Sequence, residues 1–205
     1  MRHPREVLAE HFGLSLEATR AAHKRQDGHP EARRLWDGMR TWSDQQAYSQ
    51  VAGRVFLEEA GLPVTKANIQ AVARIWNHPE RELLPNAIRV LDNLKTKYRL
   101  GIISNAMPSR RSYELPRHGL LSYFDPIVIS REVGFDKPQP EIYRIALREA
   151  EVKADEAALI DDRPENLMAA ERLRFAVTVL FDPNDRWPEW KGKRVGDLSE
   201  LEALF

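Results

Sequence analysis

Four short apolar runs in the second half of the chain constrain the fold most strongly. They lie near residues 100–103, 126–129, 157–160 and 177–181, and polar residues follow each of them. Helical patterns separate the last three runs, at about 140–149 and 164–174. Strands that alternate with helices pair in parallel through right-handed crossovers. The pattern predicts an α/β fold with a parallel sheet, whose ligand site lies at the carboxyl ends of the strands.

The first half of the chain has a different periodicity. Apolar residues recur there at helical spacing, and no alternating pattern competes with them, so we expect helices. Trp36, Trp42 and Trp76 are interpreted as helix-packing residues rather than as the walls of a binding groove. The boundary signals are Ser43 as the cap of a helix over 44–60, Gly61 after it, Thr65 as the cap of 66–76, Pro85 in the first turn of 86–97, and a final helix over 199–205 after a turn at 191–194.

Composition excludes several classes of function. The 205 residues contain 31 Lys and Arg against 31 Asp and Glu, so no net charge favours nucleic acid or an anionic membrane as a partner. The absence of cysteine excludes a disulfide framework, a thiol nucleophile and a cysteine-ligated metal. No run is apolar enough for a membrane span or a secretory signal, and we expect a cytoplasmic protein.

Two candidate phosphate-binding residues follow strands. Ser104 ends the first predicted strand, where its hydroxyl could donate to a phosphoryl oxygen, although taken alone it reads more simply as a helix cap. Lys137 lies in a loop over 134–140 whose two prolines restrict the backbone. An ammonium held there would neutralise a phosphoryl group, and we favour this role over that of a solvated lysine.

Two carboxylates end the third predicted strand. Asp161 and Asp162 follow four apolar residues, and such a pair is costly to bury near a core unless a cation compensates it. Oxygen ligands of this kind suit magnesium better than zinc. Alternatively, Asp162 caps the helix that begins near Pro164, and the two roles could coexist.

These segments, in this order and spacing, resemble three motifs of the haloacid dehalogenase-like (HAD) hydrolases. The second motif matches Ser104 after its strand, the third matches the loop around Lys137, and the fourth matches Asp161-Asp162 with Asn166 four residues later. The DDxxxN form is similar to that of sugar-phosphate phosphatases and of the phosphatase domain of soluble epoxide hydrolase. The resemblance implies a Rossmann-type parallel sheet core over 81–205 and an N-terminal helical cap subdomain over 1–80.

The resemblance also implies an activity. The family's phosphatases hydrolyse small phosphorylated metabolites with Mg²⁺, and the cap decides which ester enters. The acid pair favours this branch over haloacid dehalogenation. The implied roles are shared among six residues: Ser104, Asn105 and Lys137 bind phosphoryl oxygens, Asp162 holds Mg²⁺, Asp161 supports it, and Asn166 stands behind them.

The family's first motif is an apolar strand that ends in a nucleophilic aspartate, with a second acid two residues later. Nothing before the helical region matches it, because residues 7–10 look helical and Asp37 follows no strand. We therefore expect a core without its first strand, weak Mg²⁺ binding and little or no activity. A truncated or miscalled start is the favoured explanation. The alternatives are a non-catalytic relative that binds a phosphate ligand or a protein partner, with its sheet completed in a homodimer, and a purely structural module.

Overall fold

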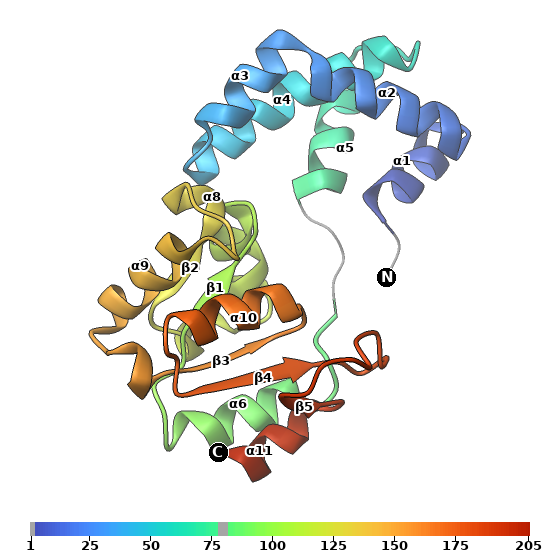
Figure 1. The fold of residues 1–205 in the computed structure, drawn as a ribbon. Coiled ribbons are helices and arrows are strands. Elements are labelled where there is room, and N and C mark those ends of the chain that lie inside the picture. Colours follow the sequence, from blue (N-terminus) through green and yellow to red (C-terminus); the bar gives the residue numbers. More distant parts are fainter. Residues whose placement is uncertain (1–2, 78–81) are drawn as a thin grey trace. The chain divides into compact units, whose positions relative to one another are not determined.

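The computed structural model describes residues 3–77 and 82–205, which belong to two compact units (Figure 1). The helical unit spans Met1–Glu82 and Met107–Glu114, and the sheet unit spans Leu83–Ala106 and Leu115–Phe205. The predicted boundary between residues 80 and 81 lies outside the described residues. Among the helices that are described, none is both long and apolar enough to cross a membrane.

The helical unit packs around its longest helix, α4. Phe56 and Leu57 of α4 are fully buried, and Leu8, Ala22 and Val72 from the neighbouring helices pack against them. Gly53 allows the approach of α5, because a Cβ atom there would lie 3.2 Å from the carbonyl oxygen of Ile69. The elements of this unit are α1 (Pro4–Phe12), α2 (Leu16–Gly28), α3 (Pro30–Gly38), α4 (Trp42–Glu59), α5 (Lys66–Asn77) and the π-helix η1 (Arg110–Glu114).

Two of the predicted helix boundaries in this unit are confirmed, and one is wrong. Thr65 caps α5 by accepting a hydrogen bond from the Asn68 N–H, and Gly61 has a φ of +67° after α4. The cap of α4 is Thr41 rather than Ser43. Thr41 Oγ1 accepts from the Asp44 N–H while Asp44 Oδ2 accepts from the Thr41 N–H, and only the three-residue spacing allows this reciprocal pair.

The sheet unit contains the four predicted strands, and every pairing is parallel, as predicted. A fifth strand, β5, forms where the sequence suggested a turn, because Lys193–Val195 add to the edge of β4. The strands are β1 (Ile102–Ser104), β2 (Ile127–Ile129), β3 (Ala158–Asp161), β4 (Val177–Phe181) and β5 (Lys193–Val195).

Helices cover both faces of the β3–β4–β5 ladder (Figure 1). Val179 of β4 packs with α6 and α11, whereas its neighbour Leu180 packs with α9 and α10 on the opposite face. The helices are α6 (Ala87–Lys95), α7 (Leu115–Arg117), α8 (Ser130–Val133), α9 (Pro140–Ala150), α10 (Pro164–Arg172) and α11 (Leu201–Leu204), with 3-10 turns η2 (Leu121–Tyr123), η3 (Ala154–Glu156) and η4 (Leu198–Glu200). Helix α6 begins at Ala87, later than predicted, because Asn86 has a φ of +63° that no helix accepts.

Among the described residues the strands form two separate ladders, β1–β2 and β3–β4–β5. The Ile102 N–H donates to the carbonyl oxygen of Pro126, at the edge of β1 that faces β2. In a parallel ladder successive residues turn their N–H and C=O groups to alternate edges of the strand, so those of Ile103 face the opposite edge. By the same alternation Ile160 of β3 points its peptide groups away from β4, and its side chain is 38% exposed. The edges of β1 and β3 that face away from their partners therefore have no strand beside them in the described part of the chain.

Candidate functional site

Asn105, which follows β1, forms hydrogen bonds with the loop that carries Lys137. Asn105 donates from its amide nitrogen to the Lys137 carbonyl at 2.8 Å, and its amide oxygen accepts from the Lys137 N–H at 2.7 Å. This double contact fixes the backbone of Lys137 beside the end of β1. Asn105 therefore positions Lys137, and its predicted role as a donor to a phosphoryl oxygen stays a prediction, because its amide nitrogen carries a second N–H. Ser104, half-buried beside it, makes no hydrogen bond through its hydroxyl with any described residue.

The Lys137 ammonium meets the end of β3. Its Nζ lies 2.5 Å from Asp161 Oδ2, and only 11% and 4% of the two side chains are exposed. The other carboxylate oxygen of Asp161 accepts from the Arg163 N–H at 3.0 Å and from the Asn166 amide at 2.9 Å. These three donors compensate the buried charge, as buried carboxylates require. The structure thus brings the ends of two strands together around one lysine.

A buried tyrosine contacts the backbone of Asn166, the residue whose amide donates to Asp161. The Tyr143 hydroxyl donates to the Asn166 carbonyl at 3.0 Å. Burial raises the pKa of Tyr143, and the nearby charge of Asp161 raises it further, so the phenol stays protonated and remains a donor. Helix α10, which carries Asn166, is thereby tied to helix α9, which carries Tyr143.

Asp162 faces a different partner from Asp161. It is 56% exposed, its Oδ2 lies 3.3 Å from Arg186 Nη2, and its carbonyl accepts from the Trp187 indole N–H at 3.1 Å. Sequence reasoning assigned no role to these two residues. Their loop is fixed by Asp182, whose buried carboxylate accepts from the N–H groups of Arg186 and Trp187 at 2.9 and 3.0 Å. The sequence does indicate Asp182 as a candidate, because this residue directly follows the predicted strand over 177–181, as Asp161 and Asp162 follow theirs.

Asp182 should make the stability of the protein sensitive to acid. Burial alone raises the pKa of this carboxyl, but the two backbone hydrogen bonds and Arg194 hold it below its ordinary value of 3.8. A lowered pKa adds stability that is fully present above the unfolded value and is lost as the pH falls through the folded value. In Asp182→Asn, the free energy of unfolding should fall less between about pH 5 and about pH 2 than in the unmodified protein.

Urea denaturation across this range measures the difference. Asp155→Asn, at an exposed position, serves as the matched control and should keep the original acid dependence. Equal acid dependence in the Asp182 variant and the unmodified protein would contradict this role of the carboxylate.

The carboxylates present do not form a complete metal site. Both oxygens of Asp161 are engaged by donors, so Asp162 is the member of the pair that a cation could reach. In the described residues, no three His, Cys, Asp or Glu side chains gather closely enough to hold an ion. Asp37 lies in α3, pairs with Arg33 on the surface and follows no strand.

Comparisons with known proteins agree with this architecture. The family model for haloacid dehalogenase-like hydrolases matches residues 7–180. Phosphoserine phosphatase of Thermus thermophilus is 33% identical over 193 residues, which cover 86% of this chain and 76% of that protein. Glyceraldehyde 3-phosphate phosphatase of Methanothermobacter thermautotrophicus is 39% identical over 80 residues, which cover 38% of this chain and 35% of that protein.

A solved structure extends the comparison to the fold. The 2-haloacid dehalogenase of Pseudomonas syringae superposes with a TM-score of 0.68 and 21% identity, over 98% of this chain and 86% of that one. This likeness supports the fold alone. The family model covers most of the chain and the phosphoserine phosphatase is similar over most of its length, so the chain belongs to the haloacid dehalogenase-like hydrolase family.

Proposed function

We propose that this chain binds the phosphoryl group of a small phosphorylated metabolite at the ends of β1 and β3, in the manner of a phosphatase-type member of its family. The observation that carries the proposal is Lys137, whose ammonium pairs with Asp161 and whose backbone Asn105 holds at the end of β1, next in sequence to Ser104. A cation from this loop and a hydroxyl donor at the end of β1 are suited to phosphoryl oxygens. The similarity to curated phosphatases supports this branch over dehalogenation.

Each residue has a distinct role in this proposal. Lys137 and Ser104 contact the phosphoryl oxygens, whereas Asn105 and Asp161 fix the position of the lysine. Asp162 is the carboxylate available to Mg²⁺, and a single exposed carboxylate supports only weak binding of that ion.

We further propose that the attacking carboxylate is not among the residues that the structure describes. A nucleophilic aspartate needs an accessible oxygen that points at the phosphorus atom. Asp161 and Asp182 are buried and accept hydrogen bonds through both oxygens, and Asp162 pairs with Arg186. Phosphate binding without turnover is therefore the expected behaviour of the chain.

Titration with inorganic phosphate tests the binding site. At ten times the dissociation constant, binding should stabilise the protein by about 1.4 kcal/mol and raise Tm by about 3 to 5 °C. Lys137→Met should abolish the shift because it removes the cation, and Ser104→Ala should reduce it. Each Tm is compared with that of the same variant without phosphate, so altered basal stability does not enter the result.

Lys191→Ala is the matched control, because this lysine is exposed in a loop of the same unit. Its phosphate-dependent shift should equal that of the unmodified protein. A phosphate-dependent shift that persists in Lys137→Met would contradict phosphoryl binding at this site. The absence of a shift in every protein would contradict it as well, and would favour a purely structural module.

A further inference from the structure

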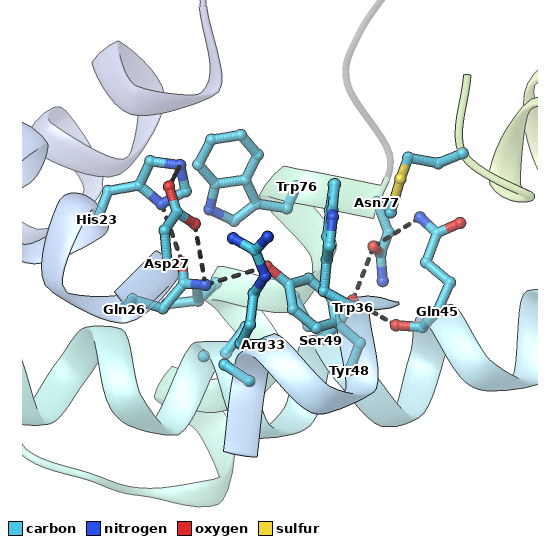
Figure 2. A pocket seen from close by; sticks show the side chains of 16 residues that line it. His23, Gln26, Asp27, Arg33, Trp36, Gln45, Tyr48, Ser49, Trp76 and Asn77 are labelled. Carbon is cyan, nitrogen blue, oxygen red and sulfur yellow. Dashed lines mark hydrogen bonds and ion pairs between the residues drawn. The ribbon is translucent and has the colours of Figure 1, made fainter. Parts of the chain in front are cut away.

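The helical unit contains a cavity of about 440 Å³, and none of the strand-end residues is among those that line it (Figure 2). Aromatic and apolar side chains form most of its walls. Trp36 and Tyr48 meet edge to face with ring centroids 5.3 Å apart, and Trp76, Val72 and Met107 line other parts. Trp36 and Trp76, interpreted from the sequence as packing residues, also line this cavity, and Trp76 packs against the helical core as well. A cavity of this volume is in the range of small-molecule sites.

One wall of the cavity is a buried amide network. Asn77, only 8% exposed, accepts through its Oδ1 from the Gln45 amide at 3.0 Å and from the Ser49 hydroxyl at 2.9 Å. Gln45 is fixed in turn, since its Oε1 accepts from the Ser109 N–H at 2.8 Å. These bonds determine which way the Asn77 amide points (Figure 2). Its Nδ2 group has no hydrogen-bond partner among the described residues, and because Asn77 lines the cavity this donor is accessible rather than sealed in the core.

A second donor belongs to Trp76, which is half-buried and also lines the cavity. Its indole ring stacks on His23, with centroids 4.6 Å apart and planes 20° from parallel. The indole N–H makes no hydrogen bond to the described residues. Burial lowers the pKa of His23 against the opposing effect of Asp27, so the imidazole is neutral near pH 7.

Two charged side chains, Asp27 and Arg33, also line the cavity. Arg33 pairs with Asp37 at 3.2 Å, whereas the ion-pair neighbour of Asp27 is the neutral His23 at 3.6 Å. The amide and the indole without a partner among the described residues are both uncharged donors. An anionic ligand would therefore lose its hydration without gaining an unpaired cation, because Arg33 is already paired.

We propose that this cavity is a binding site for an uncharged planar ring that carries a carbonyl acceptor. The ring would lie against Trp36, Tyr48 and Trp76, and the carbonyl oxygen would accept from the Asn77 amide and the Trp76 indole. Aromatic walls favour a flat ring by area and by geometry, and two accessible donors without a hydrogen-bond partner among the described residues favour an acceptor. The site does not depend on phosphoryl binding by Lys137, so either proposal can fail alone.

Four small probes of similar size separate the elements of this proposal by isothermal titration calorimetry. Benzamide has the planar ring and the neutral carbonyl, and it should bind best. Toluene keeps the flat neutral ring without an acceptor, and benzoate replaces the neutral acceptor by an anion; each should bind at least about ten-fold more weakly. Cyclohexanecarboxamide keeps the amide but loses the flat ring, and it should also bind more weakly than benzamide.

Two variants test the donors. Asn77→Asp keeps the oxygen that Gln45 and Ser49 contact but removes the Nδ2 donor, so benzamide affinity should fall about ten-fold. Trp76→Phe keeps a smaller aromatic ring and removes the indole N–H together with part of the ring surface, so it should weaken binding in the same direction. Gln70→Glu is the control for Asn77→Asp, because it makes the same amide-to-carboxylate change at an exposed position of α5.

Benzamide affinity that is equal to that of toluene, or absent at the solubility limit, would overturn the proposal. Unchanged affinity in Trp76→Phe would remove the indole from the site. If Asn77→Asp does not fold, the probe series on the unmodified protein and on Trp76→Phe still decides the question. Phosphate stabilisation should be the same in all three variants, which keeps this result distinct from that at Lys137.

Discussion

Replacing Lys137 with methionine should destabilise the protein by about 3 kcal/mol, a large fraction of the stability of a typical domain. Methionine keeps most of the apolar stem but removes the ammonium 2.5 Å from Asp161, whose side chain is 4% exposed. The carboxylate then stays buried with its charge uncompensated by a cation. We place the cost at the lower end of the range for broken buried ion pairs, because the Arg163 N–H and the Asn166 amide still donate to Asp161.

A double-mutant cycle shows whether the uncompensated charge is the cause. Asp161→Asn in the Lys137→Met background removes that charge and keeps an oxygen for the Asn166 amide, so the double variant should be more stable than Lys137→Met alone. Lys191→Met, at an exposed position, should change the free energy of unfolding by less than about 0.5 kcal/mol. Additive losses in the double variant, measured by urea denaturation, would show that the pair does not interact as the geometry indicates.

The convergence of Ser104, Lys137 and Asp161 could be predicted from sequence because a general rule determines it. The carboxyl ends of parallel strands lie at one edge of a sheet, and the three residues follow strands or a strand-linked loop. The same rule also predicts that Asp162 lies at this edge of the sheet, but it does not show that the side chains of Asp161 and Asp162 contact different partners. Arg186 reaches Asp162 from a loop 24 residues further on, and no local pattern encodes that contact.

The sequence alone also could not show which groups the Asn105 side chain contacts. Its amide could have pointed to a ligand, but it engages both peptide groups of Lys137 across 32 residues. The cavity in the helical unit was missed for a related reason. Trp36 and Trp76 have the spacing of packing residues, and a helical pattern shows which side chains point inward without showing how much space they leave between them.

Supplying a nucleophile should convert phosphate binding into turnover. An apolar strand that ends in Asp-x-Asp, fused to the N-terminus through a flexible linker, could pair with the peptide groups that Ile103 and Ile160 turn away from their partner strands. Both strands run in the same direction as their neighbours, so an added parallel strand would end near Ser104, Lys137 and Asp161. Its first aspartate would then attack a phosphoryl group held by the lysine and the serine.

We expect hydrolysis of p-nitrophenyl phosphate to rise at least about 100-fold over the unextended chain, since loss of a nucleophile costs several orders of magnitude in rate. The fusion with Asn in place of the first added aspartate is the matched control, and it should remain at the level of the unextended chain. Lys137→Met in the active fusion should abolish the gain. If the unextended chain already hydrolyses the ester and Asp162→Asn removes that activity, the carboxylates described here complete the site by themselves, and the argument from their engaged oxygens is wrong.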